Sequence, residues 1–302
     1  FWTDRKESRN KLSLVSSGPS LEDSFRDLVD FPGLIICGAT NAGFLLTHGI
    51  APSAVLVMDP SPVLGRILQG FRKILEQERV SLFCAPFVDG SVLSAFPPER
   101  VYFVQAYIDT VEYKTCPICK QDYIESFPHA EDFYLNNFFR LLWPEVTAYI
   151  LQAGSVGSTA PQLVTRWQIG GDSYLGFGKD PFLPSSWQER VGLLPEDCEV
   201  FLYGYDFAFS CNSSGKLKLH CPRLLSPDQE DHGLTVSSTL VEHIGLSGQR
   251  TLTEKNQLIY KRALMAWMIL TWTTPGLSGL RLYRVGQAGI AEELPTVSLS
   301  LI

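Results

Sequence analysis

The sequence predicts an α/β protein with a Rossmann-like fold, in which a mostly parallel sheet is flanked by helices. The chain has 302 residues, of which 45% are hydrophobic and 19% charged, so it can bury one large core. Short apolar runs recur along its N-terminal third, which is typical of strands that are buried on both faces. Turns of small residues and helical patterns separate these runs, and this alternation indicates parallel β-α-β units.

The expected strands are short apolar segments, namely residues 11–15, 34–37, 54–58, 81–87, 101–105 and 199–203. The expected helices are residues 21–29, 42–48, 63–78 and 253–271, and an apolar stretch at 280–302 closes the chain. Ser20, with Asp23 three residues later, has the pattern of a capping box at the start of the first helix.

Two segments interrupt the alternation of strands and helices. Residues 110–143 are aromatic and contain cysteines, and residues 170–198 are rich in Gly, Pro and Ser. We interpret both as insertions, at about these positions, in a single domain that spans residues 1–302.

Composition excludes some classes of partner. The formal net charge of -7 argues against nucleic acid, because binding to a phosphate backbone needs clustered Lys and Arg. No apolar run approaches the roughly 20 residues that cross a bilayer, so we expect no membrane partner. Seven cysteines, an odd number at irregular spacing, fit a reducing compartment, and we expect a cytoplasmic protein.

The first candidate binding site is the turn at residues 16–21, which follows a predicted strand and opens a predicted helix. Free backbone N–H groups and the helix dipole would point at Gly18, Pro19 and Ser20, where a phosphate could bind. The turn is neither a G-x-G-x-x-G loop nor a Walker loop, and the nearby Glu22 would repel an anion. The alternative interpretation is an ordinary capped helix start.

Two carboxylates lie at the carboxyl ends of predicted strands, where ligands of open α/β sheets bind. Asp59 follows residues 54–58 and could hold a ribose hydroxyl or a divalent cation. Asp206 follows residues 199–203, and His220 lies fourteen residues further on, across a polar loop. Each aspartate could instead cap a turn.

Gly154 and Ser155 belong to a second loop of small residues that leads into a helical pattern. Their N–H and hydroxyl groups could contact a nucleotide. Small residues at such a position could equally serve to pack a helix closely against the sheet.

Cys116 and Cys119 form a C-x-x-C pair, which has the spacing of half a zinc site. Cys211, His220 and Cys221 could supply the remaining ligands, but no second pair has matching spacing. We favour the alternative, a pair of reduced thiols, and therefore expect no bound metal here.

Taken in order along the chain, these motifs resemble the MptE-like family. This family groups archaeal 6-hydroxymethylpterin diphosphokinases with the motility-associated-factor (Maf) flagellin glycosyltransferases. The segments that carry the resemblance are residues 17–21, 34–41, 49–60, 154–156 and 202–220.

The resemblance implies a Rossmann-like transferase that binds a nucleotide or a nucleotide-activated donor. By position in these motifs, Gly18, Pro19 and Ser20 would meet the donor phosphate, and Asn41 and Asp59 the ribose or the acceptor. The residues of the opposite wall would be Gly154, Ser155, Gly204, Asp206 and His220. We expect Asp206 and His220 to be catalytic, with the imidazole of His220 as the proton-transfer group.

Three hypotheses on function follow. We favour sugar transfer from a CMP-sugar-like donor to an unknown acceptor, a reaction that needs no certain cofactor. The second is ATP-dependent diphosphotransfer to 6-hydroxymethyl-dihydropterin, in which ATP would bind together with Mg²⁺. Because Asp59 has no second carboxylate beside it to hold this ion, the sequence favours the sugar donor. The third is a non-catalytic nucleotide-binding or assembly protein.

Overall fold

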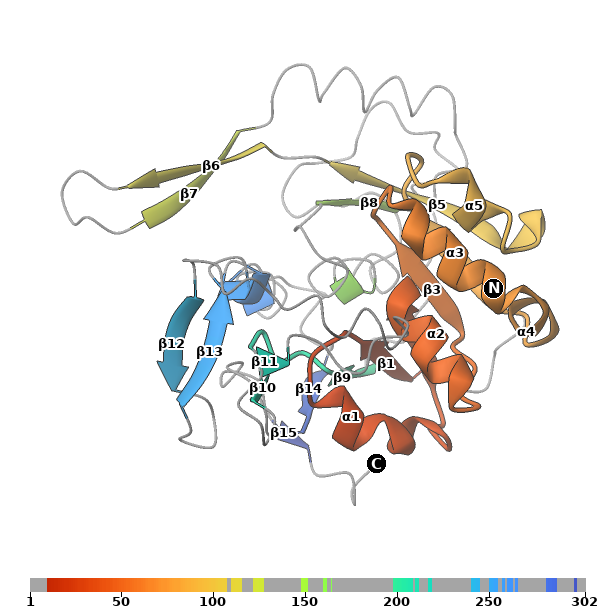
Figure 1. The fold of residues 1–302 in the computed structure, drawn as a ribbon, viewed down its shortest axis with the longest axis horizontal. Helices are drawn as coiled ribbons and strands as arrows, with labels where there is room; N and C mark the ends of the chain where they lie inside the picture. Colours follow the sequence, from red (N-terminus) through yellow and green to blue (C-terminus); the bar gives the residue numbers. More distant parts are fainter. Residues whose placement is uncertain are drawn as a thin grey trace.

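A computed structural model provides the structure of the chain (Figure 1). It describes residues 10–107, 110–115, 122–127, 148–151, 160–161, 164, 198–208, 210–211, 217–218, 240–244, 250–254, 257–258, 260–262, 264–265, 281–286 and 296–297.

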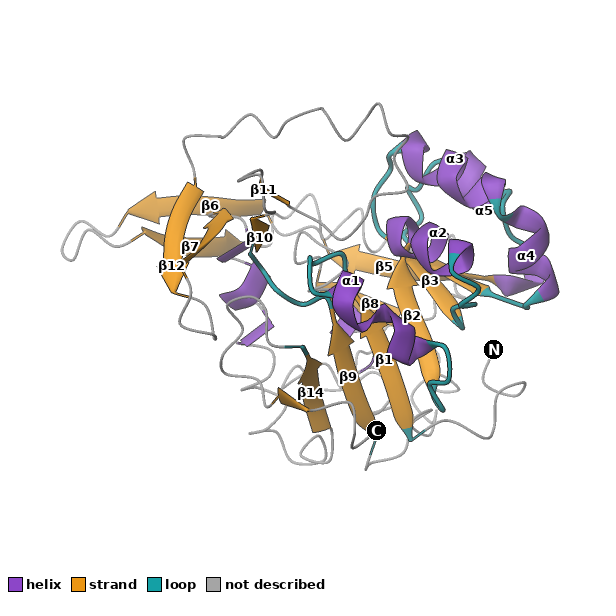
Figure 2. Cartoon of the chain, turned by 60° about the horizontal axis from the view of Figure 1, so that its bottom comes forward, coloured by secondary structure: helices purple, strands orange, loops and turns teal. Residues whose placement is uncertain are grey.

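One sheet organises this part of the chain. Nine of the described strands form it in the order β15-β14-β9-β1-β2-β3-β4-β5-β8, and every neighbouring pair is parallel (Figure 1; Figure 2). The strand bounds are Lys11–Val15 (β1), Leu34–Gly38 (β2), Ala54–Val57 (β3), Ser81–Cys84 (β4), Val101–Tyr107 (β5), Ala148–Leu151 (β8), Glu199–Tyr203 (β9), Arg281–Val285 (β14) and Thr296–Val297 (β15). The predicted α/β fold with a mostly parallel sheet is confirmed.

The strand order reverses at β1. From β1 the chain proceeds outward through β2, β3, β4, β5 and β8, whereas β9 lies on the other side of β1 and is followed by β14 and β15. Such a reversal leaves a crevice at the carboxyl ends of the strands, because the connections on its two sides run in opposite directions. A ligand site is therefore expected near the ends of β1 and β9.

The helices of the N-terminal half lie together beside β1 to β5 (Figure 2). They are α1 (Leu21–Ser24), which continues as the 3-10 helix η3 (Phe25–Leu28), α2 (Ala39–Thr47), α3 (Pro62–Gly70), α4 (Arg72–Gln77), α5 (Gly90–Leu93) and the 3-10 helix η4 (Pro98–Arg100).

Two expectations about these helices are corrected. The helix predicted at 63–78 is two helices, since Phe71, directly after Gly70, leaves the helical conformation with φ -111°. The capping box predicted at Ser20 is absent, because no side-chain hydrogen bond caps α1.

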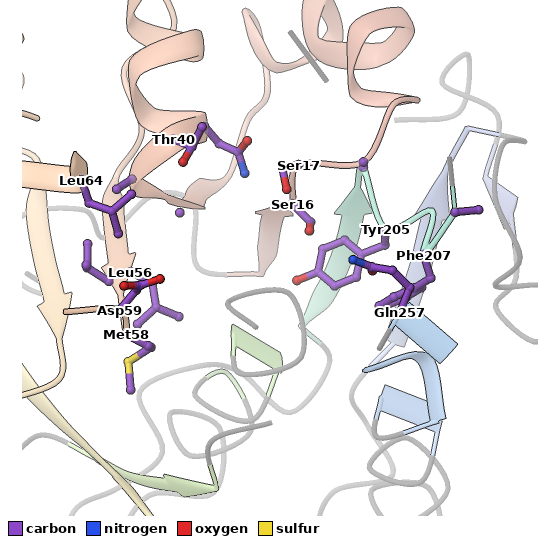
Figure 3. A pocket seen from close by; sticks show the side chains of 17 residues that line it. Ser16, Ser17, Thr40, Leu56, Met58, Asp59, Leu64, Tyr205, Phe207 and Gln257 are labelled. Atoms are coloured by element: carbon purple, nitrogen blue, oxygen red, sulfur yellow. The ribbon is translucent and has the colours of Figure 1, made fainter. Parts of the chain in front are cut away.

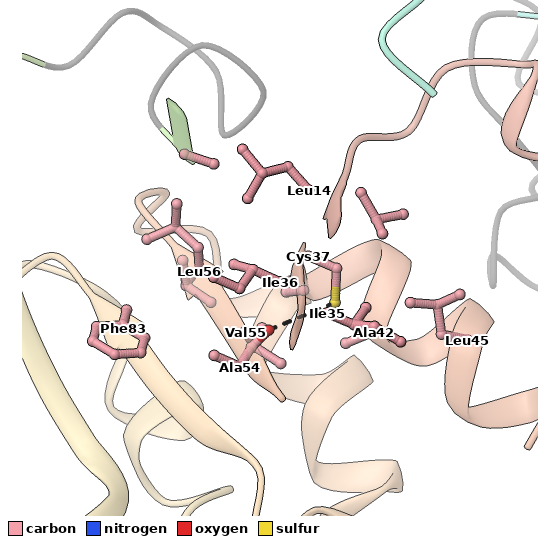
Figure 4. Packing of buried hydrophobic residues seen from close by; sticks show 14 of the residues in the cluster. Leu14, Ile35, Ile36, Cys37, Ala42, Leu45, Ala54, Val55, Leu56 and Phe83 are labelled. Atoms are coloured by element: carbon pink, nitrogen blue, oxygen red, sulfur yellow. Dashed lines mark hydrogen bonds between the residues drawn. The ribbon is translucent and has the colours of Figure 1, made fainter. Parts of the chain in front are cut away.

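The core lies on both faces of the sheet (Figure 4). Val55 and Leu56 are neighbours in β3 and point to opposite faces, yet both are fully buried. Leu14 of β1 pairs in register with Ile36 of β2, and both are buried as well. Burial on both faces is the physical reason that these strands are continuously apolar in the sequence.

Three two-stranded antiparallel units accompany the sheet within the described residues: β6 (Thr110–Thr115) with β7 (Asp122–Phe127), β10 (Ser210–Cys211) with β11 (Leu217–Lys218), and β12 (Leu240–Ile244) with β13 (Arg250–Glu254). The β6–β7 hairpin falls within the segment predicted as the first insertion. Because Thr253 belongs to β13, the helix predicted from residue 253 is corrected, and the first helical residue after β13 among those described is Gln257. In the described part of the chain, no helix has the length and apolar character needed to span a bilayer.

Candidate functional site

A cavity of about 250 Å³ opens at the carboxyl ends of β9, β1, β2 and β3, across the point where the strand order reverses (Figure 3). The described residues that line it are Ser16, Ser17 and Gly18 after β1, Gly38, Ala39, Thr40 and Asn41 at and after the end of β2, Leu56, Val57, Met58 and Asp59 at the end of β3, Leu64 of α3, Gly204, Tyr205, Phe207 and Ala208 after β9, and Gln257. The cavity therefore has the position at which open α/β sheets bind ligands.

Helix α2 begins at this cavity. Gly38 is extended (φ -75°, ψ 165°), and Ala39 starts a helix of 9 residues whose N-terminus no side chain caps. The first N–H groups of a helix have no partner within it, and the helix dipole attracts anions to this end. Because Gly38, Ala39, Thr40 and Asn41 all line the cavity, these donors are available to a negatively charged group there.

Asn41 lies on the cavity wall, and its side chain is buried. Its amide Nδ2 donates a hydrogen bond to the carbonyl oxygen of Val15 at 3.0 Å. This bond connects the first turn of α2 to the end of β1, so Asn41 holds in place, relative to each other, two elements that border the cavity. A contact between Asn41 and a ribose or an acceptor stays a prediction.

Asp59 is exposed at the end of β3 and lines the cavity. Its Oδ1 accepts a hydrogen bond from the backbone N–H of Ser61 at 2.7 Å, in the turn that leads into α3. The second oxygen, Oδ2, has no hydrogen bond to any described residue. Asp59 therefore both closes a turn, as the alternative interpretation held, and keeps one carboxylate oxygen for a ligand.

The turn at Gly18 reaches the cavity, but its backbone donors are already engaged. The N–H of Gly18 donates to the carbonyl oxygen of Gly204 at 2.9 Å, and the N–H of Ser20 donates to Oδ2 of Asp206 at 2.6 Å. The expectation that these N–H groups are free is wrong, because the turn packs against the segment after β9. Pro19 and Ser20 are not among the described lining residues, and their contacts with a phosphate stay predictions.

Two glycines make this close packing possible. A Cβ atom on Gly18 would lie 2.3 Å from the carbonyl oxygen of Gly204. Gly204 has φ +66°, and a Cβ atom there would lie 2.4 Å from the carbonyl oxygen of Ser16. Any other residue at these positions would force the two strand ends apart.

The carboxylate of Asp206 is buried and holds the Gly18 turn. The backbone N–H of Ser20 donates to Oδ2 and the hydroxyl of Ser20 donates to Oδ1, each at 2.6 Å. Burial raises the pKa of Asp206, and the Ser20 hydrogen bonds and the charge of Arg284 oppose part of this rise. Asp206 is absent from the described cavity wall. These contacts indicate a positioning role, and the catalytic role predicted for Asp206 stays a prediction.

The lining residues that were not predicted as site residues include Tyr205, Phe207 and Gln257. Tyr205 and Phe207 alternate with Gly204 and Asp206 after β9, so their position beside a predicted site was a usable signal. Phe207 has φ +53°, a conformation rare for non-glycine residues, and its carbonyl oxygen accepts a hydrogen bond from Thr253 Oγ1 at 2.6 Å. No local pattern placed Gln257 at the cavity.

Several predicted site residues lie outside the described part of the chain, and their roles stay predictions: Gly154, Ser155, His220, Cys116 and Cys119. Within the described part, no group of three or more His, Cys, Asp or Glu side chains is arranged to hold a metal ion.

The contribution of Asp206 to stability is expected to fall as the pH rises. Its pKa is higher in the folded state than the value of about 3.9 in an unfolded chain, so the folded state binds more protons above that pH. The pH-dependent part of this contribution is full below about pH 3.9 and is lost as the pH rises through the folded pKa, whereas the part that does not depend on pH remains. Urea unfolding of the wild type and of Asp206→Asn should therefore show a wild-type advantage that narrows with increasing pH.

Asp89 is a matched control, because its carboxylate also accepts hydrogen bonds from the N–H and the hydroxyl of one serine, Ser91. The Ser91 side chain and backbone lower the pKa of Asp89. Its contribution is present above about pH 3.9 and is lost as the pH falls through the folded pKa. Asp89→Asn should therefore show the opposite slope from Asp206→Asn. Parallel slopes would contradict the direction assigned to Asp206.

Comparisons with known proteins agree with this architecture. Residues 3–128 match the family described as 6-hydroxymethylpterin diphosphokinase MptE-like, so the resemblance found in the motifs is confirmed over that range. A solved structure of a Maf glycosyltransferase from Magnetospirillum magneticum AMB-1 is similar with a TM-score of 0.50 and 14% sequence identity. The similarity covers 98% of this chain and 34% of that one, and at this identity it shows the fold alone. A search of curated proteins finds no match.

Proposed function

We propose that this chain is a transferase of the MptE-like and Maf type, and that its cavity binds the nucleotide part of an activated donor. The observation that carries the proposal is the uncapped N-terminus of α2, which opens into the cavity where the strand order reverses. Phosphate groups bind at helix ends of this kind. The family match over residues 3–128 supports the proposal, because it includes the walls formed after β1, β2 and β3.

The donor groups of the cavity favour a sugar nucleotide over ATP. The described lining residues include one carboxylate, that of Asp59, and no Lys or Arg. The single phosphodiester charge of a CMP-sugar-like donor can be balanced by backbone N–H groups and a helix dipole. ATP carries more charge and is nearly always bound with Mg²⁺, for which Asp59 is the one carboxylate ligand among these residues.

The side walls suit the remaining parts of such a donor. Tyr205 and Phe207 stand on one side of the cavity, and Leu56 and Met58 on the other, so a planar base would meet apolar surface (Figure 3). The free carboxylate oxygen of Asp59 can accept hydrogen bonds from sugar hydroxyls. In this proposal the chain binds and orients the donor, and His220 takes up the proton that the acceptor loses.

Two alternative functions predict different ligand binding. ATP-dependent diphosphotransfer to 6-hydroxymethyl-dihydropterin would make binding depend on Mg²⁺. A non-catalytic nucleotide-binding or assembly protein would bind the nucleotide without turning over any donor.

A thermal-shift panel tests the proposal, because a ligand that binds the folded state raises the melting temperature. The ligands are CMP, a CMP-sugar, a UDP-sugar and ATP, each with and without Mg²⁺. We expect cytidine compounds to raise the melting temperature without Mg²⁺. A shift with ATP that requires Mg²⁺ would favour diphosphotransfer, and no shift with any ligand would contradict the proposed donor site.

Asp59→Asn is the site variant for the same panel, and Asp30→Asn is its control. Both aspartates are exposed, but only Asp59 is among the described residues of the cavity wall. We expect Asp59→Asn to weaken the binding of the CMP-sugar about tenfold, since it removes a charged acceptor for hydroxyl groups. Asp30→Asn should bind as the wild type does.

A further inference from the structure

Tyr205 is a buried residue whose hydroxyl faces the cavity. The residue is 2% exposed and lines the cavity. Its ring reaches from the end of β9 into the open space with the hydroxyl foremost (Figure 3). The ring belongs to the buried core, whereas the hydroxyl at its tip faces the cavity.

The hydroxyl of Tyr205 has no hydrogen-bond partner among the described residues. The ring contacts Phe207, with 6.1 Å between ring centroids and 75° between ring planes. Burial raises the pKa of Tyr205, so the phenol keeps its proton throughout the physiological range and acts as a donor. A hydroxyl on a buried ring usually has a hydrogen-bond partner, and the cavity that Tyr205 lines is the direction from which one can come.

The segment after β9 fixes this hydroxyl in place. Gly204 lies in the left-handed region at φ +66°, and Phe207 does so at φ +53°. Between them, each carboxylate oxygen of Asp206 accepts a hydrogen bond from Ser20 at 2.6 Å. The hydroxyl of Thr253 donates a hydrogen bond to the carbonyl oxygen of Phe207. Tyr205 is thus held on both sides, so that its donor is oriented before a ligand arrives.

Two independent sets of donors therefore meet in one small cavity. The uncapped N-terminus of α2 brings backbone N–H groups from one side of β1, and Tyr205 brings a phenol from the other side. Neither set carries a formal charge, and both can donate to one anionic group. Donors of this kind, fixed around a common space, are how proteins bind phosphate without a cluster of basic side chains.

We infer that the Tyr205 hydroxyl and the N-terminus of α2 together form the anion-binding subsite of the cavity, with the Tyr205 Oη–H donating to a phosphate oxygen of the ligand. The inference rests on the proposed function for the identity of the ligand. It assigns the phosphate to the space between α2 and the end of β9, instead of to the Gly18 turn, whose N–H groups are engaged.

Calorimetric titration with CMP and with cytidine, which lacks the phosphate, tests the subsite. Tyr205→Phe removes the hydroxyl and keeps the ring. Tyr203→Phe is the matched control: Tyr203 lies two residues earlier and is buried, its hydroxyl has no hydrogen-bond partner in the described part of the chain, and it is not among the described lining residues. We expect Tyr205→Phe to weaken CMP binding about tenfold and to leave cytidine binding unchanged, as loss of a hydrogen bond to a charged group predicts. Tyr203→Phe should change neither.

The outcomes separate this inference from the proposed function. If Tyr205→Phe binds CMP as tightly as the wild type, the subsite is wrong although a nucleotide site stands. Equal affinity of the wild type for CMP and cytidine would likewise overturn the subsite, because the phosphate would contribute nothing. If the wild type binds neither compound, both the subsite and the proposed function fail.

Discussion

Replacing Gly18 with alanine is expected to lower the free energy of unfolding by about 3 kcal/mol and to abolish binding of CMP. The added Cβ atom would lie 2.3 Å from the carbonyl oxygen of Gly204 and 2.6 Å from Oδ2 of Asp206. The carbonyl oxygen belongs to the backbone and already accepts a hydrogen bond from the Gly18 N–H at 2.9 Å. The two strand ends must therefore separate, and both of them line the cavity.

Gly70→Ala is the control for this prediction. Gly70 is the last residue of α3, and a Cβ atom there would meet nothing within 4 Å. Alanine in a helix is favoured over glycine by up to about 1 kcal/mol, so this variant should keep or gain stability. Urea unfolding and titration with CMP measure both variants. Equal unfolding free energies for the two would show that the segments at Gly18 and Gly204 are not in close contact.

Much of the fold could be predicted from the sequence, because strands that are buried on both faces are continuously apolar runs of residues. Strands β1 and β9 have the predicted bounds, since each is a short apolar run that ends at small or polar residues. Helix α2 was predicted three residues late, because Ala39, Thr40 and Asn41 are small or polar and the apolar pattern starts only at Ala42. That error concealed the helix end that faces the cavity.

The site could be predicted only in part, because its decisive contacts join distant residues. Asp59 was recognised by its place at a strand end, which is a local property. The bonds between Ser20 and Asp206 span 186 positions, and no periodicity records such a pair. Ser20 was predicted to cap a helix and Asp206 to be catalytic; the structure shows that the two are hydrogen-bond partners, and the catalytic role of Asp206 stays a prediction. Pairing of this kind follows from sheet order, which places β9 beside β1.

Asp206→Ala is expected to destabilise the protein by about 3–5 kcal/mol, a loss typical of removing one partner from a buried charged network. The substitution leaves the N–H and hydroxyl of Ser20 without their acceptor and removes the negative charge that acts on Arg284. Asp89→Ala is the control, because Asp89 is only half-buried and also accepts hydrogen bonds from the N–H and the hydroxyl of one serine, Ser91, so that this variant should lose less stability.

A double-mutant cycle with Ser20→Ala distinguishes a positioning role for Asp206 from a catalytic one. If Asp206 acts by holding Ser20, the two substitutions are coupled, and the double variant loses less stability than the two single losses combined, by about 1–3 kcal/mol. Ser20→Ala should then also weaken binding of CMP in the same direction as Asp206→Ala, because both release the segment that carries Tyr205. A catalytic acid or base predicts another pattern: Asp206→Ala would stop turnover while CMP binding and the stability cycle stayed unaffected. Unfolding free energies and CMP affinities of the four proteins decide between the two roles.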